Sequence, residues 1–141
     1  MTTDDIVAIQ QILALYGHLV DDRDWTRLSM VFTDDVVFDA TDAGGKTAAR
    51  SLDELRAMFD HPKTLHPLAH HITNPYVWRE PDGTVHARSK IVGILADGRA
   101  GSGSYLDILV LTEQGWRIRN RKVTLRRESQ LLRAPPEYRK S

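Results

Sequence analysis

The sequence predicts an α+β protein in which three helices precede a curled antiparallel sheet. Three observations support this class. The first 60 residues carry apolar side chains at helical spacing, the chain after residue 67 has the alternation of long strands, and short glycine-containing turns separate those strands. Helices and strands segregated along the chain are typical of α+β architecture. With 141 residues, 41% of them hydrophobic, the chain can form one domain around one core.

Residues 4–21 are expected to form the first helix. Either Thr2 or Thr3 can cap its start, and Asp4 and Asp5 suit the positive end of the helix dipole. Its apolar side chains recur every three or four positions and form one stripe: Ile6, Ile9, Leu13, Tyr16 and Val20.

Two further helices and a strand are expected before residue 61. Residues 24–32 suit a short helix capped by Asp24. Residues 33–41 have the β-branched and aromatic content of a strand. Residues 51–60 open with Ser-Leu-Asp-Glu, which matches the capping-box pattern of a helix start.

The rest of the chain predicts an antiparallel meander, because Asp-Gly and Gly turns join its apolar runs. Residues 1–130 are therefore expected to form a single domain, and the proline-rich residues 131–141 a flexible tail. The four expected strands are 68–80, 84–96, 101–113 and 115–128.

The composition argues against several classes of protein. There is no cysteine, so disulfides, thiol nucleophiles and thiolate metal sites are excluded. No apolar run is long enough to cross a membrane, and the first residues do not resemble a signal peptide, so a cytoplasmic protein is expected. The basic residues of 117–127 alternate with apolar ones and include no aromatic residue to stack on bases, so no nucleic-acid partner is expected.

Three stretches resemble the SnoaL-like group of the nuclear-transport-factor-2-like superfamily: "IQQILALYGHLVDDRDWTRLSMVFTDDVVFDA", "HHITNPYVW" and "GSYLDILVLTEQGWRIRNRKV". The resemblance covers residues 5–128. It implies a cone-shaped α+β barrel with three N-terminal helices packed on a strongly curved sheet. Similar proteins include scytalone dehydratase, bile-acid dehydratase and polyketide cyclases. The resemblance therefore implies a cofactor-free lyase or isomerase that acts on a small, hydrophobic, often cyclic substrate, and that forms a homodimer or homotrimer.

The same resemblance implies three catalytic residues. In the dehydratase and dehydrochlorinase branch, an aspartate at the end of the first helix pairs with a strand histidine. By motif position these are Asp21 and His70, the latter opening the His-x-x-x-Asn motif that ends at Asn74. A tyrosine lies five residues before the aspartate in dehydratases, and Tyr16 matches it. His70 is then the general base, Asp21 orients it, and Tyr16 donates a hydrogen bond to a substrate oxygen.

The residues themselves leave alternatives open. His70 and His71 are adjacent in an expected strand, so they point to opposite faces and cannot bind one metal together. Without the resemblance, His70 reads as an ordinary polar strand residue. Asp21 could lie in a solvated turn, and Asp22 is its rival for a role in the site. We expect no metal and no cofactor.

Asn74, Tyr105 and Arg121 are the expected substrate-binding residues. Gly103, Tyr105 and Asp107 alternate along one strand and therefore share a face. Arg121 could equally lie on the surface, and Asp107 is only a loose candidate for a buried acid.

Two points affect the expected reaction. Dehydrochlorinases carry a lysine where this chain has Tyr16, which makes dehydrochlorination doubtful. The fold also hosts proteins without catalytic activity. The second hypothesis is therefore a protein that binds a hydrophobic ligand or assembles with other subunits without catalysing a reaction.

Overall fold

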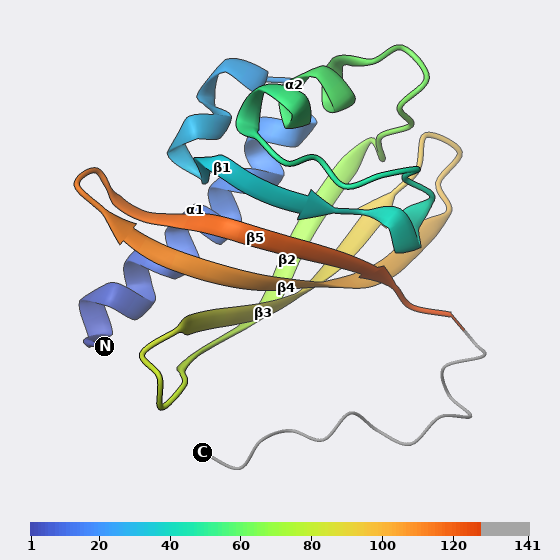
Figure 1. Cartoon of the computed structure of the whole chain (residues 1–141). Coiled ribbons are helices and arrows are strands. Elements are labelled where there is room, and N and C mark those ends of the chain that lie inside the picture. The colour runs from blue at the N-terminus through green and yellow to red at the C-terminus, as the bar shows by residue number, and fades with distance from the viewer. Residues whose placement is uncertain (128–141) are drawn as a thin grey trace.

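The computed structural model describes residues 1–127 and shows helices packed against one sheet (Figure 1). The expected tail, 131–141, lies outside the described residues. The regular elements are α1 (Thr3–Asp21), β1 (Phe32–Asp39), α2 (Leu52–Asp60), β2 (Ala69–Arg79), β3 (Val85–Ile94), β4 (Ala100–Thr112) and β5 (Gly115–Leu125), with short 3-10 helices at Trp25–Met30 and Thr41–Ala43.

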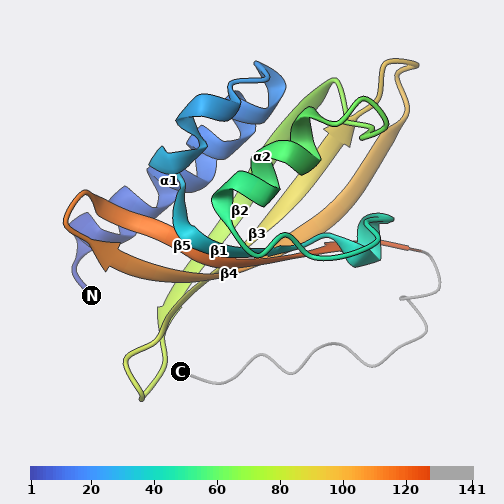
Figure 2. The ribbon, with the colours of Figure 1, turned by 45° about the horizontal axis from the view of Figure 1, so that its top comes forward.

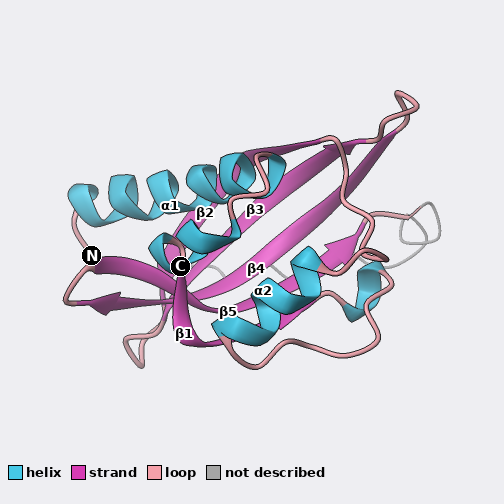
Figure 3. Cartoon of the chain, turned by 90° about the horizontal axis from the view of Figure 1, so that it is seen from above, coloured by secondary structure: helices cyan, strands magenta, loops and turns pink. Residues whose placement is uncertain are grey.

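The five strands form one mixed sheet in the order β1-β5-β4-β3-β2. β1 runs parallel to β5, and the other neighbours are antiparallel. The sheet is strongly twisted, and α1 and α2 lie over the same face of it (Figures 2 and 3). The α+β class is confirmed. The sheet curls into an open cone and does not close into a barrel, since β1 and β2 remain its edges.

Helix α1 begins with the expected cap. The Thr2 hydroxyl accepts a hydrogen bond from the Asp5 amide at 3.1 Å, and the Asp5 carboxylate accepts one from the Thr2 amide at 2.7 Å. This reciprocal pair is the capping box. The Trp116 indole also donates to Asp5, at 3.0 Å, and so connects the start of α1 to β5.

The expected second helix is a 3-10 helix of six residues, Trp25–Met30. Asp24 caps it as predicted, because its side chain accepts a hydrogen bond from the Arg27 amide. Leu28 within this helix and Phe32 just after it are buried, so the short segment still covers the core.

Strand β2 contains a bulge that changes which residues face inward. Thr73 pairs with Lys90 and Tyr76 with Arg88, so two residues of β2 oppose one residue of β3. One of the two, Asn74, has a φ of 51°, in the left-handed region that asparagine tolerates better than most residues.

No helix among the described residues is long and apolar enough to span a lipid bilayer.

Candidate active site

Asp21 and His70 meet where the end of α1 packs against β2. His70 Nδ1 lies 2.7 Å from Asp21 Oδ1. The backbone amide of His70 also donates to both carboxylate oxygens, at 3.0 Å each. A carboxylate at a helix C-terminus opposes the helix dipole, and these three contacts compensate for that placement.

A glycine lets the helix come close enough for this contact. A Cβ atom on Gly17 would lie 3.1 Å from the His70 carbonyl oxygen and 3.3 Å from Ile72 Cγ1. Gly17 is buried in the interface between α1 and β2, one turn before Asp21. The role of Gly17 could not be predicted from the sequence, because an isolated glycine within a helical pattern carries no signal of what it approaches.

The hydrogen bond to Asp21 fixes the tautomer of His70. A carboxylate only accepts, so Nδ1 carries the proton and Nε2 of the neutral ring holds the lone pair. The His70 side chain is 7% exposed. The imidazole can therefore accept a proton at Nε2 while Asp21 holds Nδ1.

Tyr16, Tyr105, Arg121 and Asp107 form a buried cluster next to His70. Arg121 Nε and Nη2 donate to the two oxygens of Asp107, at 2.8 and 2.7 Å. The guanidinium carbon lies 4.4 Å from the Tyr16 ring centroid and 4.1 Å from that of Tyr105. The Tyr16 and His70 ring centroids are 6.5 Å apart. These side chains fill the inner part of the cone.

Burial sets the protonation of this cluster. Burial raises the pKa of Tyr16 above its ordinary value of 10, although the charge of Arg121 opposes the shift. The Tyr16 hydroxyl therefore keeps its proton at neutral pH and can donate it. Burial alone would lower the pKa of Arg121, but the carboxylate of Asp107 outweighs it, and the guanidinium stays charged. Burial also raises the pKa of Asp107, although the charge of Arg121 opposes this shift.

The structure brings only some of the expected site residues together. Tyr16, Asp21 and His70 are neighbours, and Tyr105 and Arg121 adjoin Tyr16. Gly103, Tyr105 and Asp107 are all buried on one face of β4, as their spacing predicts. The other expected substrate-binding residue, Asn74, is exposed in the β2 bulge, apart from this group, where its evident role is in the backbone. His71 and Asp22 are also exposed.

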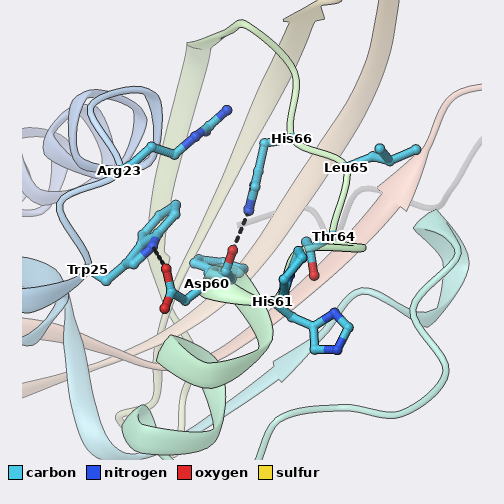
Figure 4. Close-up of a pocket in the computed structure, with 9 residues that line it drawn as sticks. Arg23, Trp25, Asp60, His61, Thr64, Leu65 and His66 are labelled. Atoms are coloured by element: carbon cyan, nitrogen blue, oxygen red, sulfur yellow. Dashed lines mark hydrogen bonds between the residues drawn. The ribbon is translucent and has the colours of Figure 1, made fainter.

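A pocket of about 420 Å³ opens beside Asp21 and His70, and we call it the outer pocket (Figure 4). Tyr16, Asp21 and His70 do not line it. Two of its lining residues are close to the dyad in sequence: Trp25 lies four residues after Asp21, and His66 lies four residues before His70. The residues that line this pocket carry no motif that predicts a site. They come from the turn after α1, the end of α2 and the loop before β2, and include Arg23, Trp25, Phe59, Asp60, Thr64 and His66.

Within residues 1–127, no three histidine, aspartate or glutamate side chains form a group that could hold a metal ion.

The curled sheet under two helices defines a cone-shaped α+β fold (Figure 3). A model of the SnoaL-like domain family matches residues 1–122. The chain therefore belongs to the SnoaL-like domain family. A comparison with curated proteins found no match.

Solved structures share the fold over nearly the whole chain. A Novosphingobium aromaticivorans protein, provisionally named an aromatic ring hydroxylase, is 29% identical, with a TM-score of 0.73 over 89% of this chain and 91% of that one. The Kfla4162 protein of Kribbella flavida is 26% identical, with a TM-score of 0.65 over 86% and 90%. A second N. aromaticivorans protein, provisionally named a scytalone dehydratase, is 20% identical, with a TM-score of 0.70 over 89% of both chains, and supports the fold alone.

Proposed function

We propose that this protein is a cofactor-free lyase or isomerase of the dehydratase type, with His70 as the general base. The observation that carries the proposal is the 2.7 Å contact between His70 Nδ1 and Asp21, which leaves Nε2 as the basic nitrogen. Membership of the SnoaL-like family supports the same reaction class. The expected substrate is a small, hydrophobic, cyclic molecule with a proton made acidic by a neighbouring carbonyl.

The proposed elimination has three parts. His70 Nε2 removes a proton from the carbon next to the carbonyl, and the electrons of that C–H bond form the new double bond. Asp21 stabilises the imidazolium that results. Tyr16 donates a hydrogen bond to the oxygen on which negative charge develops. The hydroxyl on the next carbon takes the proton from the His70 imidazolium as its C–O bond breaks, and it leaves as water. The buried setting of Tyr16 strengthens its contribution, because water competes poorly there.

The test uses a β-hydroxyketone that reports its own dehydration. 3-Hydroxy-1-tetralone loses water to give 1-naphthol, which absorbs strongly and can be followed spectroscopically. His70→Ala and Asp21→Asn are each expected to lower kcat by about 10²- to 10⁴-fold, because positioned general-base catalysis contributes that much. His71→Ala is the matched control and should retain the full rate, since the His71 side chain is exposed beside the dyad. Full activity in both dyad variants would refute the base assignment.

A second candidate function is supported by the packing of the cone. Tyr16, Tyr105 and Arg121 are each no more than 3% exposed and fill the space where a substrate would bind most deeply. A filled cone suits a protein that binds a hydrophobic ligand nearer the surface, or that assembles through its sheet, without catalysis. A ligand that raises the melting temperature of both wild type and His70→Ala, with no turnover by wild type, would favour this candidate.

A further inference from the structure

We propose that the outer pocket binds an aromatic ring that carries an anionic substituent. The proposal goes beyond the proposed function, since Tyr16, Asp21 and His70 do not line this pocket. The binding itself depends on side chains that do not belong to the dyad. Three features of the pocket support it: an aromatic wall, a cation at the rim and the charge distribution between them.

Three aromatic side chains form one wall of the outer pocket. The ring centroids of Trp25 and Phe59 are 5.4 Å apart, those of Trp25 and His66 5.3 Å, and those of Phe59 and His66 5.4 Å. The Trp25 indole donates to Asp60 at 3.2 Å, and this bond fixes its orientation (Figure 4). A wall of fixed aromatic rings favours a flat, apolar ligand that can pack against it.

Arg23 supplies the cation. Its guanidinium carbon lies 6.0 Å from the Trp25 ring centroid, so a ring packed against the wall has its edge near this charge. Arg23 Nη1 donates to the Val20 carbonyl at 2.8 Å, which anchors the side chain to the end of α1. No ion pair in residues 1–127 includes Arg23, so the remaining N–H groups can bind a carboxylate or phenolate.

The electrostatic potential favours an anion at the end of the pocket where Arg23 lies. His66 Nε2 lies 2.8 Å from the Phe59 carbonyl and must donate to it, so Nδ1 holds a lone pair. Burial lowers the pKa of His66 and the charge of Arg23 lowers it further, although the hydrogen bond to the Phe59 carbonyl opposes the shift. The ring is therefore neutral at pH 7, and it senses the positive charge of Arg23. The one acidic lining side chain, Asp60, keeps its negative charge, but it lies on the side of Trp25 away from Arg23 (Figure 4).

The experiment compares two probes of the same shape and different charge. Calorimetric titration of the full chain with 2-naphthoate and with neutral 2-naphthalenemethanol is expected to show tighter binding of the carboxylate. Arg23→Gln should weaken 2-naphthoate binding about tenfold, as expected for loss of one charge-assisted contact, and leave the alcohol unchanged. Arg27→Gln is the matched control, because this exposed arginine pairs with Asp24 and does not line the pocket.

Nuclear magnetic resonance can locate the bound ring. The three indole N–H groups have different partners, since Trp25 donates to Asp60, Trp78 to Glu80 and Trp116 to Asp5. Addition of 2-naphthoate should shift the Trp25 indole signal and leave the Trp116 signal in place.

Equal affinity for the two probes, no effect of Arg23→Gln, or an unmoved Trp25 signal would each overturn this inference. The outcome is separate from that of the kinetic test, because His70→Ala should still bind 2-naphthoate. Loss of turnover in the dyad variants without naphthoate binding would support the dehydratase and reject this pocket. Naphthoate binding without turnover would support this pocket and reject the dehydratase.

Discussion

Asp107→Ala is expected to lower the free energy of unfolding by about 3–5 kcal/mol, because it leaves a buried charge without its partner. Arg121 is 1% exposed, and two of its nitrogens donate to Asp107. Its third nitrogen, Nη1, already has no acceptor among the described residues. A guanidinium cannot release its proton in a protein, so the variant cannot neutralise the charge.

Arg121→Met should cost less than Asp107→Ala, because an isolated Asp107 can take up a proton. Burial raises the pKa of Asp107, and removing Arg121 removes the charge that opposes this shift. The folded variant then binds a proton more tightly than its unfolded chain does. The stability that Asp107 contributes is therefore fully present below the ordinary aspartate pKa and is lost as the pH rises toward 7, so the deficit of Arg121→Met relative to wild type should grow with pH.

Urea unfolding of the two single variants and of Asp107→Leu/Arg121→Met measures this pair. The double variant should lie close to wild type, since replacing a whole buried ion pair by apolar residues is often neutral. Arg119→Met serves as the surface control, because its pair with Asp35 is more than half exposed and should contribute less than about 1 kcal/mol. A loss of less than 1 kcal/mol in Asp107→Ala would contradict the buried pair.

Gly103→Ala is expected to be the second large destabilisation. A Cβ atom at this position in β4 would lie 2.5 Å from the Thr124 carbonyl oxygen and 3.2 Å from Ile91 Cγ2. The first contact is with backbone, so the strands themselves must shift. We expect a loss of about 2–3 kcal/mol in the free energy of unfolding, at the upper end of the range for overpacking.

Gly101→Ala is the matched control for this substitution. It lies in the same strand, and a Cβ atom there would meet nothing within 4 Å. Since alanine restricts the unfolded chain, this variant should be unchanged or more stable by up to about 1 kcal/mol. Equal unfolding midpoints for the two variants would show that β4 and β5 do not approach as closely as the structure places them.

Much of the fold was predictable because local patterns and packing agree. The apolar stripe of residues 4–21 became the buried face of α1, and the four long apolar runs became β2 to β5 within about three residues at each end. The contact of Asp21 with His70 came from the family motif. Spacing alone left both residues as ordinary polar positions.

The burial of Arg121 could not be predicted from alternation. Trp116 and Ile118 face the core, and strict alternation from them would put Arg121 on the outer face. In the structure, Leu109 pairs with Ile118 and Ile108 with Asn120, so β5 carries one extra residue at this point. Such a bulge reverses the facing of every later side chain in the strand, and nothing in the local sequence marks it.

The double attachment of His70 to one carboxylate has a consequence for dynamics. β2 is an edge strand, and the amide of His70 donates to Asp21 instead of to a neighbouring strand. Asp21 is the last residue of α1, so any fraying of the final helical turn releases the imidazole and this amide together. Hydrogen–deuterium exchange at a single backbone N–H thus reports how often the base is correctly held, without any substrate present.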